Sequence, residues 1–459
     1  MPYNISHLMK FIQEISQRFL PSGTRNQIII KNIFGSLGLK LINIATSFLV
    51  VPITLKYLDK INYGIWVALT SFIAWFLILD IGLGNGLRNK FAEARAHGDF
   101  EKTKIYVSTT YILILGLVIV LLGVFSTLTL FINWSSFLNI PQERNIEIRN
   151  LVLVVYLIMS FHFLLKPISM ILLADLKTFL NDFIKTTGSV LSLGGVYYLS
   201  KSSSTSLVDY AVIYTSIPII VMLIASLWLF WKPYKYCRPS LRFFNIEYIR
   251  PLFLTGSMFF ILQICGIILF QAPNLVISHY MGPAEVTVYS IAYKYYSTVF
   301  MFYDIMVTPY WSGFTEAYQK RDFEWIRNVI KKFNSLWFFI LIIFGLLIFI
   351  NPIFFKLWLN KKIVVPVGLS LSISLFLVIL LKTMPYLSFL NGTTKIRIQI
   401  YYTVLEVVLF LPVSHLFIKT FNLGSIGMAL TMAVLTFPGV FIYRWQVDHV
   451  LKKENPLPS

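Results

Sequence analysis

About twelve apolar stretches, each long enough to cross a lipid bilayer, run through this 459-residue chain. A bilayer core about 30 Å thick needs roughly 20 apolar residues per helix. The stretches lie near residues 27–56, 63–87, 105–132, 150–173, 183–200, 209–231, 252–280, 286–314, 333–358, 365–390, 398–418 and 425–447. They predict an all-α polytopic membrane protein of about twelve transmembrane helices.

The composition excludes a water-soluble globular enzyme. Charged residues make up only 13% of the chain, about half of their share in ordinary soluble domains, and the mean hydropathy is +0.73. The net charge of +19 indicates an anionic binding partner, which is a nucleic acid, an acidic membrane surface or an anionic cargo. Nucleic acid is excluded because the basic residues interrupt apolar runs and form no solvated domain. Cys237 and Cys265 supply neither a disulfide framework nor a metal site, and no cofactor is expected.

The distribution of Lys and Arg predicts the orientation in the membrane. With the N-terminus inside, the segments 1–31, 88–104, 174–185, 232–250, 315–332, 391–397 and 444–459 are cytoplasmic and hold 26 of the 39 basic residues. Nine are external, and the remaining four lie within spans: Lys40, Lys166, Lys294 and Lys382. We therefore expect both termini in the cytoplasm. Residues 1–26 are no cleavable signal peptide and form either an amphipathic surface helix or a disordered tail.

A repeat relates the two halves of the chain at an offset of 223 residues. FAEARAHGDFEKTK (91–104) aligns with FTEAYQKRDFEWIR (314–327), with six of fourteen residues identical, and Tyr57 aligns with Tyr280. Each repeated loop follows the second span of a six-span half, so the copies are parallel and related by an axis along the membrane normal. The alternative is chance similarity between two amphipathic loops.

The repeat predicts two six-helix lobes, 27–231 and 251–447, joined by a basic linker, 232–250, and followed by a cytoplasmic tail, 448–459. Two such lobes can rock about a central cleft and expose it to alternate sides of the membrane, which is the architecture of a transporter. A protein that only anchors or scaffolds needs no such duplication.

Two motifs resemble a known family. SFLVVPITLKYLDKINYGIW (47–66) and DIGLGNGLRNKFAEARAHGD (80–99) resemble the polysaccharide-exporter branch of the MOP flippase superfamily, the Wzx-type O-antigen flippases. The resemblance is strongest over the first two spans and extends loosely over the whole chain. It implies a MATE-like, V-shaped fold with a central cavity, in the bacterial plasma (inner) membrane.

The resemblance also implies a function in polysaccharide biosynthesis. It implies a flippase, not an enzyme, that moves an undecaprenyl-pyrophosphate-linked oligosaccharide, such as an O-antigen (lipopolysaccharide) or capsule repeat unit, to the outer leaflet through a cationic cavity. Its expected partners are this cargo, membrane lipids, H⁺ or Na⁺ and other polysaccharide-assembly proteins, without nucleic acid. Two alternatives stay open: a multidrug or ion antiporter of the same superfamily, and a membrane-embedded polymerase or glycosyltransferase. Short external loops and the lack of an HExxH, DxD or GxSxG motif disfavour the enzyme.

A polar stripe follows one face of the first span. Asn32, Ser36, Lys40, Asn43 and Ser47 recur at spacings of four, four, three and four, which places them on one side of a helix. Ionisable groups inside a bilayer face a cavity or a partner, so Lys40 indicates a water-filled lumen. The alternative, polar contacts between helices, explains the Ser and Asn residues well and Lys40 poorly.

The second span ends in two charged residues on one face, Asp80 and Arg88. Arg88 lies at the cytoplasmic mouth, either as a cargo contact or as an arginine that reaches the lipid headgroups. Asp80 is deeper, and it either neutralises Lys40 or takes up a proton in a coupling cycle.

The eighth span combines Lys294 and Asp304 with several tyrosines, among them Tyr293 and Tyr296. Lysine suits a phosphate and tyrosine rings suit sugar faces, whereas the alternative for the tyrosines is packing or an interfacial aromatic belt. The seventh span adds three polar residues beside a proline: Gln271, Asn274, Ser278 and Pro273.

Further ionisable candidates are Lys382, Lys166 with His162, and Glu406, which is interpreted as a partner of Lys382. Four lysines within spans against Asp80, Asp304 and Glu406 leave a slight cationic surplus, which fits an anionic cargo. Two other acids, Asp175 and Asp182, border a short internal loop and are interpreted as boundary residues, not a metal site.

Overall fold

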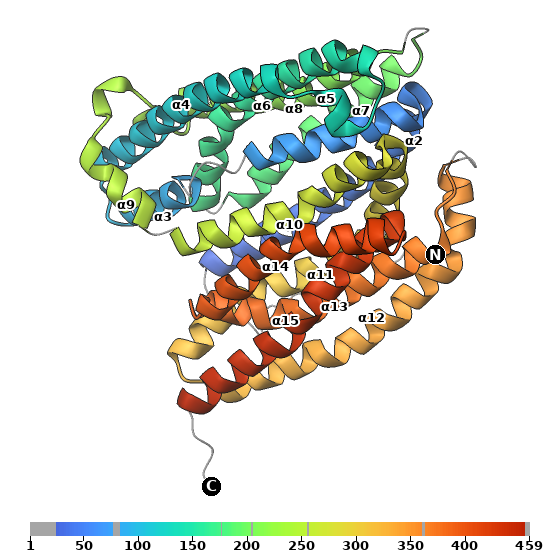
Figure 1. Cartoon of the computed structure of the whole chain (residues 1–459). Coiled ribbons are helices and arrows are strands. Elements are labelled where there is room, and N and C mark those ends of the chain that lie inside the picture. The colour runs from blue at the N-terminus through green and yellow to red at the C-terminus, as the bar shows by residue number, and fades with distance from the viewer. Residues whose placement is uncertain are drawn as a thin grey trace, which may run out of the picture.

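The computed structural model describes residues 24–76, 83–175, 177–202, 205–254, 257–359 and 363–454. Within these ranges every regular element is a helix (Figure 1), which confirms the predicted all-α fold. The predicted surface segment 1–26 lies outside these ranges except for its last three residues.

Seven α-helices belong to the first half of the chain. They are α2 (Thr24–Phe76), α3 (Leu83–Ala96), α4 (Phe100–Phe131), α5 (Trp134–Leu138), α6 (Asn145–Ala174), α7 (Thr178–Leu199) and α8 (Leu207–Trp231). α2 contains a break at Asp59, where φ is 69° and ψ is 177°. α2 therefore holds the first predicted span and most of the second, and α3 completes the second.

The second half follows three short 3₁₀ turns in the linker. Its helices are α9 (Ile249–Leu254), α10 (Ser257–Met281), α11 (Pro283–Gln319), α12 (Phe323–Trp358), α13 (Val367–Gly392), α14 (Arg397–His415), a π-helical turn (Leu416–Thr420) and α15 (Gly424–Glu454). Among the described residues, nine helices are long and apolar enough to cross a membrane. α7 and α11 also have the length of a span and carry more polar side chains.

The outward sides of the helices are apolar, as they are in a protein surrounded by lipid. Phe131 at the end of α4 is 82% exposed and Phe349 on α12 is 81% exposed. In water such side chains would be buried, because each fully buried Phe contributes roughly 1.5–3 kcal/mol of stability. Together with the spans, they identify a multi-pass membrane protein.

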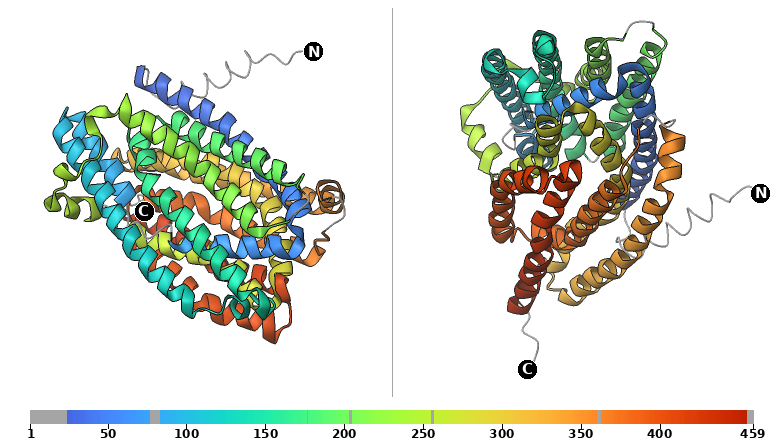
Figure 2. Two further views of the ribbon diagram at one scale, coloured as in Figure 1. Left: turned by 90° about the horizontal axis from the view of Figure 1, so that it is seen from above. Right: turned by 45° about the vertical axis from the view of Figure 1, so that its right-hand side comes forward.

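The helices form two bundles. α2 to α8 pack together as the N-terminal bundle, and α10 to α15 pack together as the C-terminal bundle (Figure 2). α2 belongs to the first bundle and also lies against α10 and α11 of the second. The boundary between the bundles therefore runs along α2.

The two halves repeat the same turns. Asp99 and Asp322 align at the offset of 223, and each caps a helix by accepting a hydrogen bond from a backbone N–H three residues later. The preceding residues, Gly98 and Arg321, both have positive φ, at 70° and 59°. Asp59 and Gly282 align as well, with φ of 69° and 87°. Repeated left-handed residues confirm the predicted internal repeat, since such backbone positions are uncommon.

The linker is bound to the N-terminal bundle. The Tyr234 hydroxyl donates to Asp175 at 2.7 Å, and the same carboxylate pairs with Arg95 at 2.6 Å and Lys177 at 3.0 Å. Burial, followed by Asp175, holds the pKa of Tyr234 well above its usual value. Asp175 is therefore more than a boundary residue, because it joins α3, the α6–α7 turn and the linker.

Candidate functional site

Lys294 joins the two bundles deep within the spans. From α11 its ammonium group donates a hydrogen bond to the main-chain carbonyl oxygen of Ser47 on α2, at 2.8 Å. The Lys294 side chain is half-buried. Four residues earlier in the predicted polar stripe, Asn43 donates to the Thr186 hydroxyl of α7 at 2.6 Å. At Asn43 the polar stripe therefore contacts another helix. This is the alternative to a water-filled lumen that the sequence left open.

Pro52 explains why α2 offers carbonyl groups to its neighbours. A proline inside a helix has no N–H, so the carbonyl four residues earlier, that of Phe48, lacks its helical partner. The indole Nε1 of Trp358 at the end of α12 donates to this oxygen at 3.0 Å. An unpaired carbonyl in lipid costs several kcal/mol. Trp358 and Lys294 of the C-terminal bundle therefore pair adjacent carbonyls of α2 just before its proline.

Gly64 marks a very close approach of the two bundles. A methyl group on Gly64 would lie 1.8 Å from the carbonyl oxygen of Pro283, so only glycine fits. Beside it, the Thr287 hydroxyl donates to the carbonyl oxygen of Lys60 at 2.6 Å. At the offset of 223, Lys60 aligns with Pro283 and Gly64 with Thr287. The two contacts are therefore equivalent, and the pseudo-two-fold axis passes between them.

Several hydrogen bonds between described residues join the bundles, and we call the following set the outer interface. They are Lys294–Ser47, Trp358–Phe48, Thr287–Lys60, Asn274–Ser71 at 2.9 Å and Ser278–Leu138 at 3.0 Å. The two deepest positions on α2, Ser47 and Ser71, are each 12 residues from Asp59, or about 18 Å of helix. The outer interface therefore occupies only the half of the molecule that contains the Asp59 turn.

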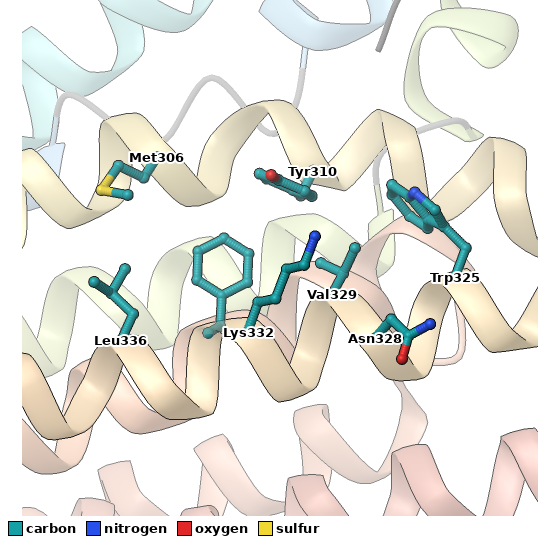
Figure 3. Close-up of a pocket in the computed structure, with 8 residues that line it drawn as sticks. Met306, Tyr310, Trp325, Asn328, Val329, Lys332 and Leu336 are labelled. Carbon is teal, nitrogen blue, oxygen red and sulfur yellow. The ribbon is translucent and has the colours of Figure 1, made fainter. Parts of the chain in front are cut away.

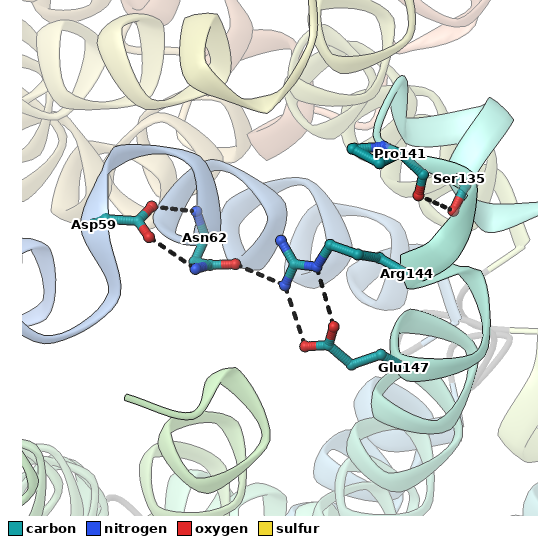
Figure 4. A network of polar contacts seen from close by, with 6 residues as sticks. All are labelled: Asp59, Asn62, Ser135, Pro141, Arg144 and Glu147. Atoms are coloured by element: carbon teal, nitrogen blue, oxygen red, sulfur yellow. Dashed lines mark hydrogen bonds and ion pairs between the residues drawn. The ribbon is translucent and has the colours of Figure 1, made fainter. Parts of the chain in front are cut away.

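A polar network holds the turn of α2 that carries Lys60 (Figure 4). Asp59 accepts a hydrogen bond from the backbone N–H of Asn62 at 2.9 Å. Arg144 donates to the Asn62 side chain at 2.8 Å and pairs with Glu147 at 3.0 Å. The turn is thereby joined to the start of α6, and it presents the Lys60 carbonyl to the C-terminal bundle in a fixed position.

A cleft of about 160 Å³ lies inside the N-terminal bundle, between α6, α7 and α8. Its polar lining residues are His162, Ser169, Asn181, Lys185 and Ser189. Lys185 forms no ion pair with any described residue, although Asp182 lies near it on the same helix. Lys166 adds positive charge beside Lys185 and His162. We call this cationic cavity the N-bundle cleft.

Lys382 and Glu406 lie inside the C-terminal bundle and do not form the predicted ion pair. The Lys382 ammonium is 4.4 Å from the centroid of the Trp337 ring, a cation–π contact between α13 and α12. Glu406 on α14 is buried, with Cys265 of α10 and Tyr443 of α15 beside it. The two side chains are separated because each packs against a different pair of helices.

The tyrosines of α11 mostly pack. Tyr296 is fully buried and accepts a hydrogen bond from Asn351 of α12 at 3.2 Å, so in this conformation it belongs to the core and not to a lumen. Tyr293 stacks on Tyr289 with ring centroids 6.2 Å apart. Asp304 accepts a hydrogen bond from the Thr308 hydroxyl at 3.3 Å. These contacts favour the packing interpretation for Tyr296.

The remaining predicted residues are dispersed. Lys40 and Arg88 are exposed, and Gln271 and Lys166 are half-buried. Asp80 lies outside the described residues, and so do the side chains of Asn32 and Ser36, which are helical in α2. The described part of the chain contains no group of three His, Cys, Asp or Glu residues that could hold a metal ion.

Two residues of the site escape sequence reasoning. The charge bias assigns Lys185 to a cytoplasmic loop, whereas α7 begins at Thr178 and carries Lys185 into the bundle. Its four-residue spacing with Asn181 and Ser189 is a helical signal that would have identified it. Trp358 has no local signal, and only the proline of α2 indicates that a donor is needed there.

Comparison with solved structures identifies the fold. The chain superposes on an inward-facing multidrug resistance MATE family transporter of the MOP superfamily with a TM-score of 0.73, at 15% identity, covering 93% of this chain and all of the other. The outward-facing conformation of such a transporter gives a TM-score of 0.59 at 14% identity, covering 93% and 97%. The protein therefore has the fold of MATE-type membrane transporters.

Comparison of sequences identifies the family. Residues 29–315 match the family described as polysaccharide biosynthesis protein, and the chain belongs to this family. It is 25% identical over 375 residues to a Yersinia pseudotuberculosis protein named as an O-antigen export protein, covering 78% of this chain and 82% of the relative. A Salmonella typhi protein named as an O-antigen transporter is 22% identical, covering 63% and 66%. The predicted family is confirmed, and both relatives are named as export or transport proteins, not as enzymes.

Proposed function

We propose that this protein is a flippase of the bacterial inner membrane. Its cargo is an undecaprenyl-pyrophosphate-linked oligosaccharide, an O-antigen or capsule repeat unit, which it moves from the inner to the outer leaflet. Membership of the polysaccharide biosynthesis family and the names of the relatives support this cargo class. The observation that carries a transport mechanism is the outer interface, whose hydrogen bonds between the described parts of the two repeated bundles all lie in the half of the molecule that contains the Asp59 turn.

The mechanism we propose is alternating access between a lobe of residues 27–231 and a lobe of residues 251–447. The excess of Lys and Arg supports a cytoplasmic position for both termini, the linker and the 88–104 loop, and an external position for the outer interface. In this mechanism, closure at the outer interface leaves the cargo contacts of the lobes accessible from the cytoplasm, where the cargo is made. The higher TM-score against the inward-facing transporter supports this state.

The N-bundle cleft is our candidate contact for the pyrophosphate. Lys185 and Lys166 supply positive charge there, and phosphate is a ligand for which lysine acts as a point charge. Lys294 bonds Ser47 while the external side is closed, so it becomes free for the cargo only when the lobes separate. Lys40 and Arg88 are exposed and are further candidate contacts for the cargo.

Coupling to H⁺ or Na⁺ is assigned to Glu406 in this proposal. This carboxyl group is buried and forms no ion pair within the described residues. A buried charge without a partner is costly, so the group favours binding a cation over standing as a free carboxylate. Asp304, whose carboxylate already accepts a hydrogen bond, is the second candidate.

A reconstituted flipping assay with a lipid-linked oligosaccharide tests the function. We expect transfer to the opposite leaflet with the wild type and a loss of at least tenfold with Lys185→Met, since a charge-assisted hydrogen bond contributes about 1.5–3 kcal/mol. Lys201→Met is the matched control, because Lys201 lies at the end of α7, outside the cleft. A cell without the protein should accumulate cargo on the cytoplasmic leaflet. Accumulation of short unpolymerised product outside would instead indicate a polymerase.

A further inference from the structure

A second cavity, of about 170 Å³, lies between α11 and α12, away from the outer interface. We call it the α11–α12 groove. Met306 and Tyr310 of α11 line it, together with Trp325, Asn328, Val329, Lys332, Phe333 and Leu336 of α12 (Figure 3). Figure 3 shows the Lys332 side chain extending from α12 toward α11, with its ammonium between Tyr310 and Trp325.

The groove changes from polar to apolar along its length. Trp325 lies in the first turn of α12, and Leu336 lies 11 residues further along it, or about 16 Å. The end near Trp325 contains the amide of Asn328 and the ammonium of Lys332, and the end near Leu336 is apolar. This order matches a lipid, with its head at the helix start and its chain directed into the bilayer.

The polar groups of the groove lack protein partners. Within the described residues, the Tyr310 hydroxyl, the Asn328 amide and the Lys332 ammonium form no hydrogen bond or ion pair. The Tyr310 ring is held by stacking on Trp325, with centroids 6.2 Å apart, and by edge contact with Phe333 at 5.0 Å. Three donors therefore line one groove whose aromatic walls are fixed.

The surrounding charge selects an anion. Between residues 319 and 336 the chain carries five basic residues, Lys320, Arg321, Arg327, Lys331 and Lys332, and two acidic ones, Asp322 and Glu324. The Asp322 carboxylate is occupied as the cap of α12, accepting from the Trp325 N–H at 3.0 Å. Basic residues beside a span attract anionic headgroups.

We propose that the α11–α12 groove binds an anionic phospholipid of the membrane. The Lys332 ammonium, with Asn328 and Tyr310, holds the phosphate, and one acyl chain lies along Phe333 toward Leu336. The site does not depend on the cargo proposed above. It gives the C-terminal bundle a lipid ligand at the cytoplasmic headgroup level.

Native mass spectrometry of the purified protein, titrated with phosphatidylglycerol or phosphatidylcholine, tests this site without a transport assay. We expect phosphatidylglycerol to bind more tightly, and Lys332→Gln to weaken it about tenfold, as expected for one charge-assisted hydrogen bond. Lys331→Gln, an exposed neighbour outside the groove, should leave binding unchanged. Met306→Trp should also weaken binding by filling the groove while every charge is kept.

Three results would overturn the proposal. Equal binding of the two lipids would remove the role of the anionic head, and equal effects of Lys331→Gln and Lys332→Gln would indicate surface charge alone. Displacement of the lipid by inorganic phosphate would indicate a free-anion site without a chain contact. Melting curves of each variant, compared with the wild type, separate lost binding from lost folding.

Discussion

The Lys294 ammonium lies 2.8 Å from the main-chain carbonyl oxygen of Ser47, so a lysine of one bundle pairs a backbone acceptor of the other. The charge of Lys294 is thereby used within the protein in this conformation. Separating the bundles at the outer interface must break this bond, and the ammonium then needs a new partner, which a phosphate can supply.

Replacing Lys294 by Met should shift the equilibrium toward separation of the bundles at the outer interface. The loss of one charge-assisted hydrogen bond, about 1.5–3 kcal/mol, corresponds to about tenfold or more in the ratio of closed to open molecules. Spin labels at Lys201→Cys and Lys419→Cys, with both native cysteines replaced by Ser, should report a longer distance. Lys382→Met is the control, because Lys382 contacts Trp337 within one bundle. Equal distances in Lys294→Met and wild type would contradict the role of the bond.

Trp358 and Pro52 should be energetically coupled. Trp358→Phe keeps a ring beside Phe48 and removes the donor to its carbonyl, which we expect to destabilise the closed state by about 1 kcal/mol. Pro52→Ala restores a backbone N–H four residues after Phe48, so Trp358→Phe should cost less in that background. A double-mutant cycle on thermal unfolding in detergent measures the coupling. Strictly additive effects would show that the indole hydrogen bond does not depend on Pro52.

Gly64→Ala should force the bundles apart at the outer interface, because the new methyl group would lie 1.8 Å from the Pro283 carbonyl oxygen. We expect loss of transport and an increased distance between the same spin labels, with the protein still inserted in the membrane. Gly116→Ala on α4 is the matched control, since no atom lies within 4 Å of its added methyl group. Normal transport by Gly64→Ala would mean that the close approach is dispensable.

Cys237 in the linker should resist alkylation in the folded protein. Burial raises the pKa of its thiol to about 12, against an ordinary value of about 8.5, so at pH 8 the reactive thiolate is about a thousandfold scarcer. Because folding raises the pKa of the Cys237 thiol, the protonated thiol contributes to the stability of the folded protein. This contribution is complete below the ordinary thiol pKa and is lost as the pH rises toward 12. N-ethylmaleimide labelling in a Cys265→Ser background measures this.

The same labelling tests whether Asp175 holds the linker. Asp175→Asn removes the ion pairs to Arg95 and Lys177, which should release Tyr234 and expose Cys237 to the reagent. Denaturation in detergent supplies the value for full labelling. Slow labelling of Cys237 in the Asp175→Asn variant would show that the linker is held mainly by other contacts.

The sequence by itself determined the class of this protein. The length and spacing of apolar runs predict helices because lipid leaves the backbone no other hydrogen-bond partners over such a distance. The offset of 223 predicts the repeat, and the structure shows the same left-handed turns at Gly98 and Arg321. Both signals are local, so they can be read along the chain.

Only the tertiary structure decided which polar residues meet. Lys294 and Lys382 are alike in sequence, each a lysine within an apolar span, yet one bonds a carbonyl of the other bundle and one lies over an indole ring. A side chain inside a span takes whichever partner a neighbouring helix presents. Packing between segments distant in the chain decides which helices are neighbours. Periodicity therefore predicts which residues share one side of a helix, but it does not predict which helix packs against that side.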